Sequence, residues 1–117
     1  MARSATRDIT EFLSSGHVEW AAGELREAER LFRAGLHETE RPDAQLAFGY
    51  VRWDWFRALT QEALGEVLAA RGLPDEASAL LSAALAFYSD PLAWRRRAEI
   101  EAKLAGIRSQ RSAPLAP

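Results

Sequence analysis

Apolar residues recur every three or four positions along most of the chain, which is the spacing of one face of an α-helix. Glycine and proline separate these stretches, so the pattern predicts an all-α protein of about five helices. We expect helices over residues 6–22, 24–38, 44–71 and 76–88, and a last helix that begins near Pro91. The pattern leaves open whether 44–71 is one helix or two, because Gly49 and Asp54 are both candidate bend positions.

Composition supports the helical interpretation and narrows the class of protein. The 117 residues include 23 alanines and 15 leucines but only ten valines, isoleucines and threonines together, and β-branched residues favour strands. No apolar run approaches the roughly 20 residues of a membrane span, and the charged, helix-like start of the sequence leads us to expect no signal peptide. The chain also lacks cysteine, which excludes disulfides and thiolate metal sites. We therefore expect a cytoplasmic protein without a membrane segment.

Charge is distributed unevenly along the chain. The net charge is −2, but residues 1–90 carry −6 and residues 91–117 carry +4. The basic run Arg95–Arg97 fans around a helix, so its three side chains cannot all face one nucleic-acid groove. We interpret it as a solvated face that complements an acidic surface of a partner or of a second copy, and the overall acidity argues against nucleic-acid binding.

No constellation of reactive side chains stands out. His17 and His37 match no metal-ligand spacing. The run Ser14-Ser15-Gly16-His17 places hydroxyls close to a histidine in the sequence, but adjacent residues of a helix point to different faces, so the run does not supply a catalytic triad. Glu62 and Glu66 are interpreted as carboxylates on a solvated helix face. We therefore expect no catalytic residues, no metal and no cofactor, and a protein that is not an enzyme.

The chain contains an internal repeat with an offset of 49 residues. Small, apolar and helix-breaking residues coincide when the two segments are aligned, in the pairs Gly16/Gly65, Gly23/Gly72, Ala28/Ala77, Phe32/Leu81 and Pro42/Pro91. The pattern predicts one helical hairpin used twice: the first glycine allows close helix contact, the second forms the turn, and alanine lies where the helices cross.

These spacings resemble the tetratricopeptide repeat. The better copy is Leu64-Gly65-x-x-Leu68-x-x-x-Gly72-x-x-x-x-Ala77-x-x-x-Leu81-x-x-Ala84, and the weaker one departs from the family at Ser15, Glu19 and Gly35. The offset exceeds the family's period of about 34 residues, so 43–57 is an insertion or an extended first helix. The resemblance implies two hairpins plus a C-terminal helix in a right-handed superhelix, within one domain over 1–108. Residues 109–117 contain two prolines and little to pack, so we expect a flexible tail there.

The resemblance also implies a groove for a partner segment. The family's groove positions correspond to Thr10, Leu13, His17 and Trp20 in the first copy, and to Leu59, Glu62, Glu66 and Ala69 in the second. The version of the family that clamps chaperone C-termini needs asparagine and lysine there, whereas this chain has no asparagine and its only lysine, Lys103, is expected elsewhere. An apolar or basic segment suits such a groove, since glutamates attract basic groups.

An aromatic cluster provides a second candidate surface. Trp53, Trp55 and Phe56 lie close together in the sequence, with Tyr50 one turn earlier. The cluster either completes the core or is covered by another chain, and we favour partial cover because tryptophan often anchors interfaces. The first hypothesis is thus a small adaptor or chaperone-like module that binds a protein or peptide. The alternative is a homodimer formed through Trp53 and Trp55.

Overall fold

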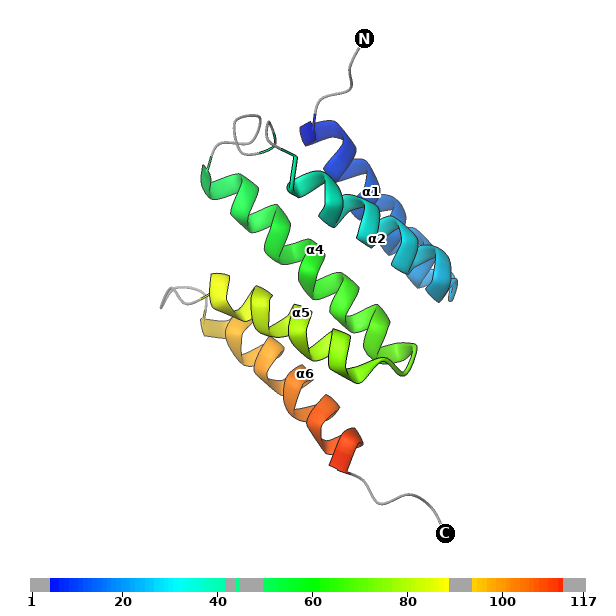
Figure 1. The fold of residues 1–117 in the computed structure, drawn as a ribbon, viewed down its shortest axis with the longest axis vertical. Helices are drawn as coiled ribbons and strands as arrows, with labels where there is room; N and C mark the ends of the chain where they lie inside the picture. The colour runs from blue at the N-terminus through cyan, green and yellow to red at the C-terminus, as the bar shows by residue number, and fades with distance from the viewer. Residues whose placement is uncertain (1–4, 42–43, 45–49, 89–93, 113–117) are drawn as a thin grey trace.

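The computed structural model describes residues 5–41, 44, 50–88 and 94–112, and within these ranges the chain is helical without a strand. The helices run from α1 (Ala5–Ala21) through α2 (Leu25–Thr39), α4 (Tyr50–Ala70) and α5 (Pro74–Phe87) to α6 (Trp94–Ser112). In Figure 1, α2 overlaps α1, and α4, α5 and α6 follow in chain order. The predicted all-α fold with five helices is confirmed for the described part of the chain.

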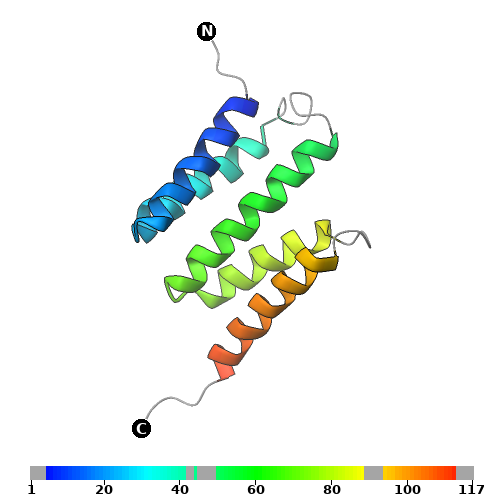
Figure 2. The ribbon, with the colours of Figure 1, turned by 180° about the vertical axis from the view of Figure 1, so that it is seen from behind.

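The helices pair in chain order. α1 packs on α2 and α4 packs on α5, so each pair forms a hairpin, and the hairpins meet where α2 contacts α4. α6 packs on α5 and also touches α4, which in turn touches α1. Figure 2 shows the molecule from the other side, where α1 lies in front of α2. α4 therefore lies between α1 and α6 and contacts both of them.

The turns of the two hairpins are built alike. Gly23 and Gly72 have φ angles of +81° and +78°, a conformation that side chains with a Cβ rarely adopt. The Glu24 N–H donates to the Glu19 carbonyl at 2.9 Å, and the Leu73 N–H donates to the Leu68 carbonyl at the same distance. Each residue of the second bond lies 49 positions after its counterpart in the first.

The helix crossings are also equivalent. A Cβ added at Gly16 would lie 2.5 Å from the ring of Phe32, and one added at Gly65 would lie 2.9 Å from Leu81. Phe32 and Leu81 are fully buried, as are Ala28 and Ala77, one turn earlier on the same helices. The predicted repeat of a helical hairpin is therefore present in the structure, since in both copies a glycine of the first helix admits the side chain at the equivalent position of the second helix.

One helix boundary differs from the sequence-based expectation, and one alternative that the sequence left open is decided in part. α4 is continuous from Tyr50 to Ala70, so Asp54 does not mark a bend, while Gly49 lies outside the described residues. α6 continues to Ser112, whereas we expected helical structure to end near Arg108. The reason is that 109–112 contain neither glycine nor proline, so nothing in the backbone stops the helix there. Pro42, Pro91 and residues 113–117 lie outside the described residues.

The main core lies between the two hairpins and continues to α6. Its buried members come from every helix except α1: Ala28, Phe32, Ala58, Ala63, Leu64, Val67, Leu68, Ala77, Leu81, Ala84, Tyr88, Ile100, Leu104 and Ile107. Leu13 and Trp20 of α1 pack against it from its edge. As expected for a helix that is apolar on most sides, α4 is buried by more than one neighbour.

Candidate functional site

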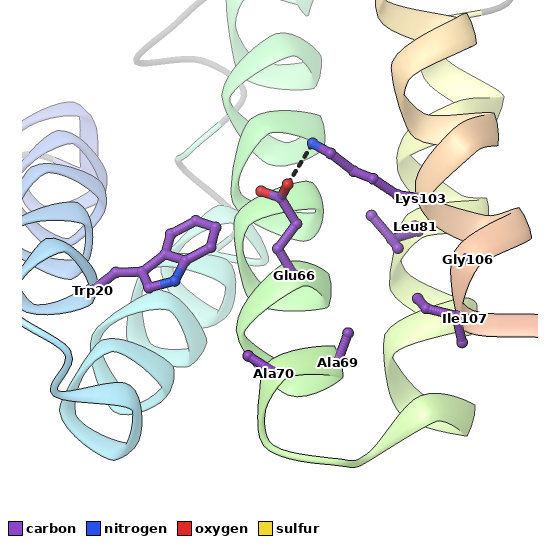
Figure 3. Close-up of a pocket in the computed structure, with 8 residues that line it drawn as sticks. All are labelled: Trp20, Glu66, Ala69, Ala70, Leu81, Lys103, Gly106 and Ile107. Atoms are coloured by element: carbon purple, nitrogen blue, oxygen red, sulfur yellow. Dashed lines mark ion pairs between the residues drawn. The ribbon is translucent and has the colours of Figure 1, made fainter. Parts of the chain in front are cut away.

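A pocket of about 370 Å³ opens where α1, α4 and α6 meet. Trp20 comes from α1 and Lys103 from α6, and α5 contributes Leu81. We call it the three-helix pocket, and its remaining lining residues are Glu66, Ala69 and Ala70 of α4 and Gly106 and Ile107 of α6. Figure 3 shows Trp20 on one side, Lys103 and Ile107 on the other, and α4 between them. The pocket stays open because alanines and a glycine occupy positions where larger side chains would fill it.

The structure brings some of the predicted groove residues to this pocket and leaves others beside it. Trp20, Glu66 and Ala69 line it. The exposed His17 ring stacks on Trp20, with ring centroids 6.0 Å apart, and meets the edge of Phe32 at 5.1 Å. The Trp20 ring also packs edge to face against Phe32, with ring centroids 6.3 Å apart. Because Phe32 belongs to the main core, these contacts fix the position of the Trp20 indole.

Further along α4, Trp55, Leu59, Glu62, Glu66 and Ala69 follow one another at helical spacing, and we call this row the α4 stripe. The stripe ends in the three-helix pocket, because Glu66 and Ala69 line that pocket. Leu59 is half-buried and Trp55 is exposed. On the neighbouring α1, Leu13 is half-buried and packs against the main core.

Glu62 lies at the centre of an ion-pair network between α4 and α6. Its side chain is only 3% exposed, and its carboxylate accepts hydrogen bonds from Arg96 Nε at 2.9 Å and from Lys103 Nζ at 2.9 Å. Lys103 also pairs with Glu66. Two negative and two positive side chains therefore neutralise one another beside the three-helix pocket.

This network corrects three sequence-based interpretations. Glu62 and Glu66 do not form a solvated carboxylate face, Lys103 lines the pocket rather than lying elsewhere, and Arg96 bonds to Glu62 of the same chain. Arg97 likewise pairs within the chain, with Glu101 at 3.5 Å. Arg96 and Lys103 lie 34 and 41 residues after Glu62 in the chain. Only the packing of α6 on α4 could therefore show that the basic C-terminal segment pairs with acidic residues of the same chain.

The network shifts pKa values in directions that favour its charged form. Burial alone lowers the pKa of Lys103, but hydrogen bonds to Glu66 and Glu62 outweigh it, so the pKa lies above its ordinary value. The pKa of Arg96 is raised too, because its pairing with Glu62 outweighs the opposing effect of burial. Burial raises the pKa of the nearby Tyr88. Lys103 and Arg96 therefore remain protonated throughout the physiological range.

The aromatic cluster divides between core and surface. Trp53 is half-buried, packs against Ile9 and Ala44, and donates its indole N–H to the Thr39 carbonyl at 2.8 Å. Trp55 is 43% exposed and meets Phe56 edge to face at 5.0 Å.

Trp94, at the start of α6, is 62% exposed. Its spacing is that of the apolar residues of the last helix, so its exposure could not be predicted from the sequence.

A second pocket, of about 410 Å³, lies between α4 and α5, away from the residues that the sequence suggested. Its lining includes Asp54, Arg57 and Gln61 of α4 and Phe87 of α5. The Arg57 guanidinium lies 5.5 Å from the centre of the Trp53 ring. No signal in the sequence pointed to this pocket, since its two walls are about 30 residues apart in the chain.

Three further observations bear on function. Among the residues with described positions, no three histidine or carboxylate side chains gather as metal ligands would. None of the described helices combines the length and apolarity needed to cross a bilayer. Comparison with known proteins found no family model, no curated protein and no solved structure that matches this chain.

Proposed function

We propose that this protein is a non-enzymatic interaction module, a small adaptor or chaperone-like protein that binds a segment of another protein. The observation that carries the proposal is the three-helix pocket, in which Trp20, Ala69 and Ala70 present apolar surface to solvent. Open apolar pockets with a few polar groups at their rim are typical of binding sites. The absence of cysteine supports a cytoplasmic location for this activity.

The repeat architecture adds support. In a stack of helical hairpins, each unit contacts only its neighbours, and the first helices of successive units form a continuous surface. Trp20 and Ala69 are equivalent positions in the two copies, and both line the pocket. This arrangement fits the resemblance to the tetratricopeptide repeat, whose first helices receive a partner segment.

The proposal is tested by affinity capture from native lysate with a variant that fills the pocket. Ala70 is exposed and lines the three-helix pocket, so Ala70→Arg should block a ligand without disturbing the core. The matched control is Ala79→Arg, because Ala79 is an exposed alanine on α5 that does not line the three-helix pocket. We expect the wild type and Ala79→Arg to retain a protein that Ala70→Arg loses. Equal recovery by all three proteins would contradict the proposal.

Self-association is the alternative, and the exposure of Trp55 beside Phe56 favours it. Trp53 is less suited to an interface, since its indole N–H already bonds to the Thr39 carbonyl. Light scattering over a concentration series tests this alternative. A dimer that Trp55→Ala dissociates would support it, and a monomer at all concentrations would exclude it.

A further inference from the structure

We infer that the three-helix pocket binds a tyrosine side chain of the partner segment, with the ring on the apolar lining and the hydroxyl donating a hydrogen bond to the Glu66 carboxylate. The inference rests on the proposed function and specifies the group that enters the pocket. It follows from a carboxylate oxygen that is open to the pocket, from the balance of charge and from the apolar lining.

Glu66 offers one carboxylate oxygen to a ligand. Its Oε1 atom pairs with Lys103 Nζ, whereas within the described part of the chain no hydrogen bond or ion pair engages Oε2. Figure 3 shows the carboxylate between Trp20 and Lys103, with one oxygen joined to Lys103 by the dashed line and the other turned toward Trp20. The Glu66 side chain is 26% exposed, so water can solvate this oxygen while the pocket is open. A ligand that covers the oxygen without a donor would remove that water and return no hydrogen bond, which opposes binding.

The balance of charge around the pocket favours a neutral donor. Glu62 and Glu66 are matched by Arg96 and Lys103, so the ion-pair network carries no net charge. An ammonium or guanidinium group would meet the positive charge of Lys103, and a carboxylate would meet the negative charge of Glu66, since both residues line the pocket. A phenol stays neutral below its pKa of about 10, and its hydroxyl forms a charge-assisted hydrogen bond with a carboxylate. It can therefore bind Glu66 while Lys103 keeps its partners.

The rest of the lining favours an aromatic ring over a small hydroxyl or amide side chain. Ala69 and Ala70 leave apolar space beside Trp20, whose ring is held in place by the stacked His17. A volume of about 370 Å³ has room for a phenol ring, and a second ring near an indole gains an aromatic contact beyond its buried area. Because the hydroxyl of tyrosine lies at the far end of its ring, the ring can contact this lining while the hydroxyl reaches Glu66.

The inference is tested by NMR titration with small probes that represent the side chain. p-Cresol carries the phenol, toluene lacks the hydroxyl, and 4-methylanisole keeps the oxygen but cannot donate. The indole N–H resonance of Trp20, assigned by its loss in Trp20→Phe, reports binding in the pocket. We expect p-cresol to bind the wild type and Ala79→Arg but not Ala70→Arg. Its Kd should be about tenfold lower than those of the other two probes, as one hydrogen bond to a charged acceptor provides.

Glu66→Gln separates the hydrogen bond from the apolar contact. The amide keeps the size of the carboxylate but removes its charge, so the hydrogen bond loses its charge assistance. We expect the preference for p-cresol over toluene to fall below about threefold in this variant, with the Kd of toluene unchanged.

The outcomes separate the inference from the proposed function. Equal Kd values of p-cresol, toluene and 4-methylanisole for the wild type would overturn the inference, as would a preference for p-cresol that survives Glu66→Gln. Tighter binding of 4-methylbenzylamine would also overturn it, because the pocket would then prefer a cation. Failure of every probe to bind in a way that Ala70→Arg blocks is a fourth contrary result. The binding function itself is decided by lysate capture: a partner that Ala70→Arg loses supports that function whatever the probes show.

Discussion

Replacing glycine with alanine at two helical positions should change stability in opposite directions. Gly16 faces the fully buried ring of Phe32, and an added Cβ would lie 2.5, 2.7 and 2.9 Å from three ring carbons. Gly106 lies in α6, and a Cβ there would meet nothing within 4 Å. Both substitutions gain about 1 kcal/mol of helix propensity, but only Gly16→Ala overpacks the core, at about 1–3 kcal/mol.

The magnitude at Gly16 lies toward the upper end of that range. Carbon atoms pack best at about 3.5–4.0 Å, so three ring atoms must move, and Phe32 has no solvent-facing space to enter. We expect Gly16→Ala to lower the free energy of unfolding by about 1–2 kcal/mol after the propensity gain. Gly106→Ala should raise it by about 0.5–1 kcal/mol. Because propensity cancels, the difference between the two variants measures the cost of the clash.

Urea unfolding followed by circular dichroism measures both changes, and an unchanged m-value shows that the unfolded state is not responsible. Adding Phe32→Leu to Gly16→Ala should relieve only part of the clash, because a Cβ at the equivalent glycine, Gly65, would still lie 2.9 Å from Leu81. If Gly16→Ala stabilises the protein as much as Gly106→Ala does, the close crossing of α1 and α2 is wrong, and with it the structural equivalence of the two hairpins.

Three other predictions concern the ion-pair network and the tryptophans. Glu62→Gln should lower the free energy of unfolding by about 1–3 kcal/mol, less than for a fully buried pair because its cationic partners are about a third exposed. In a urea-based double-mutant cycle with Lys103→Met, a coupling energy of zero would contradict the network. Raised pKa values at Lys103 and Tyr88 mean that each stabilises the fold below its unfolded pKa, about 10, so stability should fall as the pH rises from there through the folded values. The test is the urea concentration at the unfolding midpoint, measured between pH 9 and pH 11 because the ordinary pKa values are about 10. A midpoint that does not change over this range would refute the predicted loss of stability. Trp53→Phe should cost about 1–2 kcal/mol by removing the partly buried hydrogen bond to the Thr39 carbonyl, whereas Trp55→Phe should change thermal stability little. Equal losses in a melting experiment would mean that the two tryptophans do not differ in burial.

Local signals were sufficient to predict the helices and the repeat. Apolar spacing and breakers act within a few residues, so the turn glycines Gly23 and Gly72 and the crossing glycines Gly16 and Gly65 could be recognised from their offset alone. The end of α6 was missed by four residues, because helix ends without a glycine or proline carry weak local signals.

Tertiary packing decided everything that depends on contacts between distant segments. In the sequence, Glu62 and Glu66 cannot be distinguished from exposed carboxylates on a helix. Only the position of α6 makes them the ion-pair partners of Arg96 and Lys103. Trp53 and Trp55 are two residues apart, yet one bonds to the Thr39 carbonyl and the other faces solvent, because successive helical positions point about 100° apart.

The sequence by itself therefore determined the class of fold and the repeated hairpin, since helix formation and turns depend on neighbouring residues. The tertiary structure alone decided which residues line the three-helix pocket and which acidic and basic side chains pair within the chain. The physical reason is that burial and ion pairing depend on distances between segments that are tens of residues apart in the chain.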